Sequence, residues 1–202
     1  KKTYPSCEEM IKDKSIEAIY IATDAPSHAR LAIMGLNHDK HVVSAVPAVF
    51  GFEAEEEAEK LFAAVKKSGK KYMMFETSYY HDDLYRMREM YRSGTLGNVI
   101  YAEGEYWHYF GTPLAAHENW RTGLPPQWYP THSNAYYVGV TGGSFTEVSC
   151  MGFRSPIDHL KAENNRFGNP FGTEIALFRT SEGGMARMGV SWDTPGVGGE
   201  RG

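Results

Sequence analysis

The sequence has few cysteines and no long hydrophobic run. Cys7 and Cys150 are its two cysteines, which make neither a disulfide framework nor a metal cluster. No apolar run approaches the roughly 20 residues of a membrane span, and no signal peptide is visible at Lys1. These features predict no membrane partner and a reducing, cytoplasmic setting.

The sequence also lacks a strong charge of either sign. Lysine and arginine number 21 against 25 acidic residues, which gives a net charge of −4. No basic block is present that would follow a phosphate backbone, so nucleic acid is not an expected partner. With 202 residues, 42% of them hydrophobic, the chain is long enough for one large domain or two small ones with an ordinary core.

A strand, a helix and a second strand follow one another near the start. Residues 17–22 are a short run of β-forming residues, residues 27–36 have helical periodicity, and residues 41–44 begin another apolar strand. This order is typical of a βαβ unit with parallel strands, whose ligands lie beyond the carboxyl ends of the strands. The predicted ligand-binding positions are Thr23, Asp24, Pro26, His28 and the turn Ala45-Val46-Pro47.

Two further helices follow. Residues 53–68 place Ala54, Ala58, Leu61, Phe62 and Val65 on one face, and Gly69 is expected to end that helix. A strand at 71–75 leads to Glu76, and a helix over 80–93 turns Leu84, Met87 and Tyr91 inward. His81, Asp82 and Asp83 open this helix, where acidic residues are favoured, so no metal site is predicted there.

From residue 98 the hydrophobic period changes to two. Strands are predicted over 99–110, 144–151, 173–180 and 184–192, with a hairpin turn over 180–184. Such a series favours a mostly antiparallel sheet. The predicted fold is therefore α/β: a Rossmann-type parallel-sheet domain over residues 1–94, then an α+β domain with an open, mostly antiparallel sheet over 95–202.

The stretch IATDAPSHARLAIMGLNHDKHVVSAVP, residues 21–47, resembles the Gfo/Idh/MocA family of NAD(P)-dependent oxidoreductases, which includes sugar and inositol dehydrogenases. The resemblance implies NAD or NADP as cofactor and a second domain whose open sheet supplies the substrate side. It also implies a homo-dimer or homo-tetramer formed through that sheet.

The glycine-rich phosphate loop of this family is missing. No G-x-G-x-x-G follows a strand and precedes a helix, and the segment that distinguishes NAD from NADP is missing with it. Residues 193–202 are rich in glycine and end without closing an element. We therefore expect a Rossmann domain without its N-terminal half and a second domain incomplete at its end.

The turn Ala45-Val46-Pro47 departs from most of the family, which has Glu-Lys-Pro with a lysine that assists proton transfer. Valine cannot carry a proton. A Val-Pro turn resembles instead a subgroup of NAD-dependent glycoside hydrolases that includes α-N-acetylgalactosaminidases.

Other segments resemble the same subgroup: Tyr72-Met73-Met74-Phe75-Glu76, Gly104-Glu105-Tyr106-Trp107-His108, Trp120-Arg121-Thr122 and, identical to its motif, Tyr129-Pro130-Thr131-His132. Two differences stand beside these matches. The spacing from Arg121 to Tyr129 is shorter, and Pro126-Gln127-Trp128 replaces an Asn-Gly-Asp.

This resemblance implies a redox-neutral cycle on a sugar or glycoside. Bound NAD transiently oxidises the C3 hydroxyl, the aglycone is eliminated, water adds, and the hydride returns. It assigns acid/base work to His132 and Tyr129, and substrate binding to Arg121, Tyr106 and Glu76. The implied cofactor-binding residues are Thr23, Asp24, Pro26, His28, Val46, Pro47 and Glu76.

Each assignment has a simpler structural alternative. Glu76 is equally a cap or a solvated charge at a strand end, His28 a hydrogen-bonding residue at a helix start, and Arg121 a surface ion pair. Tyr129, whose unperturbed pKa is about 10, needs a neighbouring cation such as Arg121 to act as a base. The alternative function is a non-catalytic sugar- or nucleotide-binding relative, which Val46 and the shortened loop permit.

Overall fold

The computed structural model describes residues 2–112, 120–195 and 200–202. The chain divides into two compact units, residues 1–75 and 76–202. The sequence placed this division near residue 95; in the structure the helix at 82–92 packs within the second unit, so the division falls before it.

In the described residues, no helix has the length and apolar character needed to cross a membrane.

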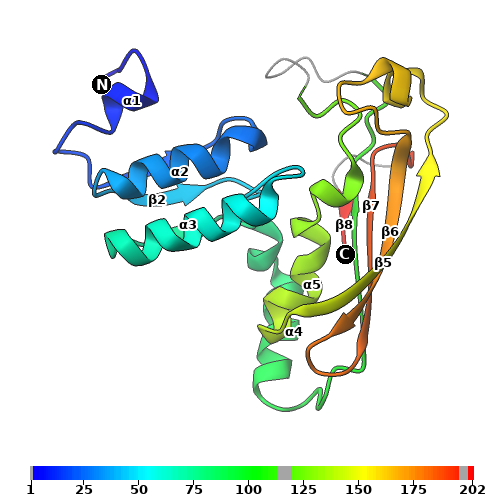
Figure 1. The fold of residues 1–202 in the computed structure, drawn as a ribbon. Helices are drawn as coiled ribbons and strands as arrows, with labels where there is room; N and C mark the ends of the chain where they lie inside the picture. Colours follow the sequence, from blue (N-terminus) through cyan, green and yellow to red (C-terminus); the bar gives the residue numbers. More distant parts are fainter. Residues whose placement is uncertain (1, 113–119, 196–199) are drawn as a thin grey trace. The chain divides into compact units, whose positions relative to one another are not determined.

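The first unit is built on a parallel three-stranded sheet, in the order β1-β2-β3. Ile19 of β1 pairs with Val42 of β2, and Val43 pairs with Met73 of β3. The predicted βαβ unit is confirmed, and helices α2 and α3 run side by side (Figure 1). The elements are α1 (Cys7–Met10), β1 (Ala18–Ile21), the 3-10 turn η1 (Ala25–Ser27), α2 (His28–Asn37), β2 (His41–Ser44), α3 (Ala54–Ser68) and β3 (Tyr72–Met74).

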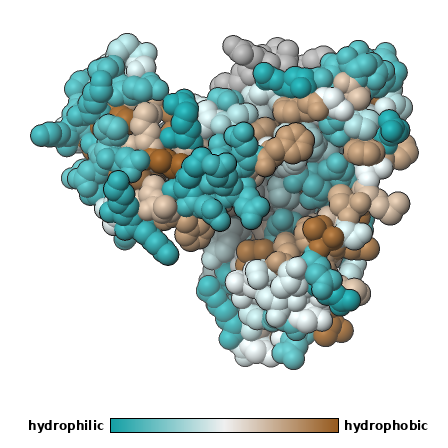
Figure 2. All heavy atoms as spheres, viewed as in Figure 1, coloured by the Kyte–Doolittle hydropathy of each residue, from teal (hydrophilic) through white to brown (hydrophobic). Residues whose placement is uncertain are grey.

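The core of the first unit lies between this sheet and its helices. The predicted inward residues of α2 are all buried: Ala29, Leu31, Ala32 and Leu36. The prediction for α3 was wrong at Phe62, which is 71% exposed. Leu61 and Ala64, three positions apart, form the buried stripe, and the residue after Leu61 is rotated by about 100° away from it. The visible surface of this unit is mostly hydrophilic (Figure 2).

Two helix ends in the first unit follow the sequence signals. The Ser6 hydroxyl accepts a hydrogen bond from the Glu9 N–H at the start of α1, as an N-cap does. Gly69 ends α3 with φ of 65°, a left-handed conformation that glycine adopts without a Cβ clash.

The second unit contains a five-stranded sheet in its described part, in the order β5-β6-β7-β4-β8. Neighbouring strands are antiparallel except β4 and β7, which are parallel, so the predicted open, mostly antiparallel sheet is confirmed. The predicted hairpin is present, with Gly183 N–H donating to the Thr180 carbonyl at 2.9 Å. The strands are β4 (Tyr101–Trp107), β5 (Phe145–Arg154), β6 (Phe171–Thr180), β7 (Met185–Ser191) and β8 (Glu200–Arg201).

Helices cover one side of this sheet (Figure 1). The helix predicted over 80–93 is divided, because His81 is extended, with ψ of 145°, between a 3-10 turn and α4. Leu84 of α4, with Met87 and Tyr91 beside it, packs on α5 as predicted. The elements are η2 (Thr77–Tyr80), α4 (Asp82–Arg92), η4 (Pro126–Trp128), α5 (Thr131–Thr141), η5 (Asp158–Leu160) and η6 (Ala162–Asn164).

Gly104 allows α5 to approach the sheet closely. A Cβ atom at this position of β4 would lie well inside 3.0 Å of the Ser133 carbonyl oxygen in α5, and 2.8 Å from the Met188 sulfur in β7. A backbone carbonyl in a helix cannot rotate away from such a clash. The missing side chain at 104 therefore sets how near the start of α5 lies to β4.

We expect Gly104→Ala to cost about 3 kcal/mol of unfolding free energy, since overpacking here displaces a helix. Gly142→Ala is the control: its Cβ meets nothing within 4 Å, and its φ of 74° leaves only backbone strain, which costs about 1 kcal/mol. Urea unfolding followed by tryptophan fluorescence measures both, because Trp107, Trp120, Trp128 and Trp192 are the chain's four tryptophans and all lie in the second unit. Equal losses of unfolding free energy in the two variants would contradict the close approach of α5 to β4.

Candidate functional site

In the first unit, His28 joins the two turns where the cofactor is predicted to pass. Its Nδ1 lies 2.8 Å from the Pro47 carbonyl oxygen and its Nε2 lies 3.1 Å from the Thr23 carbonyl oxygen. The side chain is 1% exposed. His28 is therefore a buried tie between the turn after β1 and the turn after β2.

The side chains of these turns differ in accessibility. Thr23 and Pro26 are exposed and Asp24 is half-buried, whereas Val46 and Pro47, joined by a cis peptide bond, are buried. The Thr23 and Ser27 hydroxyls lie 2.6 Å apart. A ligand at these strand ends would thus meet the first turn directly.

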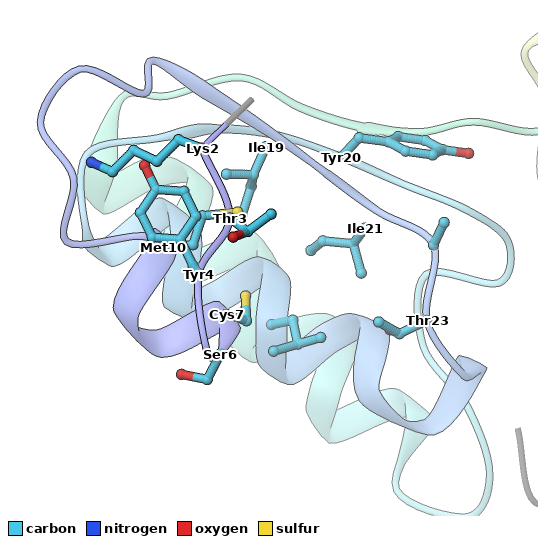
Figure 3. Close-up of a pocket in the computed structure, with 12 residues that line it drawn as sticks. Lys2, Thr3, Tyr4, Ser6, Cys7, Met10, Ile19, Tyr20, Ile21 and Thr23 are labelled. Atoms are coloured by element: carbon cyan, nitrogen blue, oxygen red, sulfur yellow. The ribbon is translucent and has the colours of Figure 1, made fainter.

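A groove of ≈ 500 Å³ runs along β1 (Figure 3). Ile19 and Ile21 point to the side of Cys7, and Tyr20 points the other way, as strand alternation requires. Of the predicted cofactor-binding residues, Thr23 lines this groove.

In the second unit, the Glu76 carboxylate is hydrogen-bonded to the His132 imidazole. Oε1 of Glu76 lies 2.6 Å from Nδ1 of His132 and also accepts a hydrogen bond from the Ser78 N–H at 2.7 Å. Glu76 is 8% exposed and His132 3%. Glu76 therefore caps η2, as the simpler interpretation of the sequence predicted, and it also bonds His132.

The environment keeps Glu76 ionised. Burial raises the pKa of Glu76, but the hydrogen bond and charge of His132 and the Ser78 N–H outweigh it and hold this pKa below the ordinary 4.5. A carboxylate bonded to one ring nitrogen fixes the tautomer and orientation of the imidazole. The contact with Glu76 therefore sets the orientation of the His132 ring.

Tyr129 is held by a cation. Nη2 of Arg121 donates to the Tyr129 hydroxyl oxygen at 3.1 Å, and the guanidinium lies 4.9 Å from the centre of the Trp120 ring. The pairing expected from the motif is thus present in the structure. A guanidinium at this distance stabilises negative charge on the phenol oxygen.

Tyr106 of β4 lies at the centre of the cluster. Its ring centroid is 4.6 Å from that of His132, 6.2 Å from Tyr129 and 5.8 Å from Trp192. The side chain is 3% exposed, so it faces the covered side of the sheet. The second unit thereby brings together the predicted site residues Glu76, Tyr106, Arg121, Tyr129 and His132.

The segment before Tyr129 is fixed to the sheet by Gln127. Its backbone N–H donates to the Glu174 carboxylate at 2.7 Å, and its Nε2 donates to the Met188 carbonyl at 3.1 Å. Burial raises the pKa of Glu174, which the Gln127 N–H only partly offsets. The Pro126-Gln127-Trp128 turn, one of the two departures from the resembled motif, thus anchors the start of α5.

Sequence reasoning missed Ser78, His108, Gln127 and Trp192 as members of this site. His108 lies two positions after Tyr106, so the strand period placed both side chains on one face. Trp192 ended a predicted strand. Nothing local marked Gln127, whose partners Glu174 and Met188 are distant in sequence.

Within the described residues, no three histidine, cysteine, aspartate or glutamate side chains form a group that could hold a metal ion. Asp83, in the sequence His81-Asp82-Asp83, accepts a hydrogen bond from the Leu84 N–H at 2.8 Å and so belongs to the first turn of α4.

Residues 1–76 match the model of an oxidoreductase family with an NAD-binding Rossmann fold, GFO_IDH_MocA. Residues 1–76 belong to the Gfo/Idh/MocA oxidoreductase family. The family predicted from the sequence is confirmed, and the second unit carries the motifs that point to a subgroup.

The curated relatives that this chain matches include glycosidases. A glycosyl hydrolase family 109 protein of Akkermansia muciniphila is 28% identical over 80% of this chain and 37% of its own length. An alpha-N-acetylgalactosaminidase of Bacteroides fragilis is 30% identical over 62% of this chain and 31% of its own. The chain thus spans about a third of the length of these relatives.

Among solved structures, scyllo-inositol dehydrogenase from Lactobacillus casei with bound NAD(H) and scyllo-inositol has a TM-score of 0.77 at 16% identity. The alignment covers 97% of this chain and 56% of that one. At this identity the likeness establishes the fold, which is a Rossmann-type sheet followed by a second domain.

The Glu76–His132 contact predicts a pH dependence of stability. The pKa of Glu76 in the folded protein is lower than its ordinary value of 4.5. The ionised carboxylate therefore stabilises the fold above pH 4.5, and this stabilisation is lost as the pH falls through the folded pKa. We expect Glu76→Gln to lower the unfolding free energy by about 2 kcal/mol at pH 7, and this difference from the wild type to shrink as the pH falls below 4.5.

Urea unfolding followed by tryptophan fluorescence at each pH tests this expectation. Glu163→Gln, an exposed acid of η6 in the same unit, is the control and should match the wild type throughout. A Glu76→Gln difference that stays constant with pH would show that the carboxylate charge does not stabilise the fold.

Proposed function

We propose that this protein is an NAD(P)-dependent enzyme of the Gfo/Idh/MocA type acting on a sugar or glycoside, and specifically a redox-neutral glycosidase. The buried hydrogen bond between Glu76 and His132, beside the Arg121–Tyr129 pair, is the observation that carries it. The names of the glycosidase relatives support the substrate class.

The second unit has the groups that sugar chemistry needs. His132, oriented by Glu76, moves a proton at Nε2 to or from a sugar hydroxyl. Tyr129, with Arg121 on its oxygen, is the second acid/base group, at the carbon beside the oxidised one. Tyr106 and Arg121 bind the sugar, whose apolar faces pack on aromatic rings.

The first unit has the strand ends that a dinucleotide uses. Thr23, Asp24 and Pro26 follow β1 and would hold the cofactor, while His28 keeps this turn joined to Val46-Pro47. NAD, when bound, supplies a reversible hydride acceptor for the sugar. The exposed Thr23 hydroxyl is the kind of donor and acceptor that a ribose or phosphate bonds.

Val46 favours one alternative, a non-catalytic relative that binds a sugar. The valine side chain is 8% exposed and offers no group for proton transfer. In the enzyme, the proton task therefore falls to His132 and Tyr129 of the second unit.

The first test is to denature the purified protein and look for released nicotinamide cofactor by absorbance and mass spectrometry. We expect about one NAD per chain, as a recycled cofactor requires, and hydrolysis of p-nitrophenyl α-N-acetylgalactosaminide. His132→Ala should lower that activity by 10²- to 10⁴-fold, the range for loss of an acid/base group, while the fold is kept.

His38→Ala is the matched control, because His38 is an exposed histidine of the first unit outside both sets of predicted site residues. Cofactor that binds weakly and is reduced in net turnover would indicate an ordinary dehydrogenase. A protein without cofactor, whose sugar binding survives His132→Ala, would be the non-catalytic relative.

The proposal includes a homo-dimer or homo-tetramer formed through the outer face of the sheet in the second unit. Met151, Phe153, Leu177 and Met185 on this face are each at least 57% exposed. Their register on β5, β6 and β7 puts them on one side, and exposed apolar side chains on one face of a sheet support such an interface. The reducing, cytoplasmic setting stays part of the proposal, because Cys7 and Cys150 are free thiols.

Light scattering on the purified protein tests the assembly. Leu177→Glu buries a charge in the proposed interface and should shift the population towards monomer, with the tryptophan-detected unfolding of the second unit retained. Glu89→Lys, at an exposed position of α4 on the helix-covered side of the sheet, is the control. A wild type that is monomeric at all concentrations would refute the assembly.

A further inference from the structure

We propose that His108 is a positioning residue for the Tyr106 hydroxyl, an inference that rests on the proposed function. Nδ1 of His108 lies 2.7 Å from the Tyr106 hydroxyl oxygen, a hydrogen bond between two residues of one strand end. Through this bond, His108 decides which way Tyr106 presents its proton and lone pairs to a sugar.

Both the backbone and the ring of His108 are held in place. Its backbone N–H donates to the Ser191 carbonyl at 2.8 Å, which extends the pairing of β4 with β7 by one residue. The ring lies edge-on to Phe110, with centroids 4.5 Å apart, and Phe110 stacks on Trp192 at 5.0 Å. Such a fixed ring provides a fixed hydrogen-bond direction.

The hydrogen bond to His108 gives the Tyr106 hydroxyl a fixed direction. A phenol hydroxyl has one proton and acceptor lone pairs, and it rotates when nothing fixes it. The Tyr106 ring lies beside the rings of Tyr129 and His132. A sugar hydroxyl bound there meets a preoriented partner, which lowers the cost of ordering on binding.

Two substitutions separate the hydrogen bond from the packing. His108→Phe keeps an aromatic ring against Phe110 and removes Nδ1, while His108→Asn keeps a polar side-chain atom near the Nδ1 position. With p-nitrophenyl α-N-acetylgalactosaminide as substrate, we expect His108→Phe to raise KM about tenfold with kcat changed less than about threefold. His108→Asn should recover most of that loss.

A double-mutant cycle tests whether the effect passes through Tyr106. His108→Phe added to Tyr106→Phe should change KM no further, since the hydroxyl that His108 holds is already gone. Additive effects would overturn the proposal, and so would a His108→Phe enzyme with wild-type KM. A purely structural role would instead make His108→Asn, which loses the ring contact with Phe110, the more damaging of the two substitutions.

A measurement that does not depend on catalytic activity separates this proposal from the proposed function. In protein labelled with ¹⁵N-histidine, Tyr106→Phe should shift the His108 Nδ1 resonance, and Tyr80→Phe, at an exposed position of η2, should not. If the wild type holds no cofactor and hydrolyses nothing, the proposed function fails. Calorimetry with N-acetylgalactosamine then replaces KM, and unchanged affinity in His108→Phe would overturn the positioning role.

Discussion

The hydrogen bond between Glu76 and His132 is the interaction on which the candidate site depends. It joins the turn at the start of the second unit to the first turn of α5, 56 residues later in the chain. Both side chains are almost fully buried, so each would carry an uncompensated polar group without the other. The same contact holds the carboxylate ionised and orients the imidazole.

Close packing in the second unit makes that contact available. Gly104 lets the backbone of α5 approach β4, and Gln127 fixes the turn that leads into α5. Tyr106, two residues beyond Gly104, then lies edge-on to His132 at 4.6 Å. The aromatic rings around it exclude water, which strengthens the electrostatic pairs that Glu76 and Arg121 form.

The first unit is organised by a different buried histidine. His28 spans the carbonyl oxygens of Thr23 and Pro47, so the two strand ends are joined without any side-chain charge. A lysine in place of Val46 would add a charge beside this tie, whereas valine is buried there. Valine carries no proton, and the proposed function therefore assigns the acid/base work to His132 and Tyr129 of the second unit.

The sequence by itself determined the elements, the family and five residues of the site. Periodicity identified the βαβ unit and the change to a mostly antiparallel sheet, because the period of burial follows directly from backbone geometry. The Tyr-Pro-Thr-His motif singled out Tyr129 and His132. The pairing of Glu76 with His132 and the anchoring of Gln127 to Glu174 were decided by tertiary structure alone, since a hydrogen bond between distant residues leaves no trace in local pattern. The exposure of Phe62 was likewise decided by which stripe of α3 packs inward, a choice that composition does not fix.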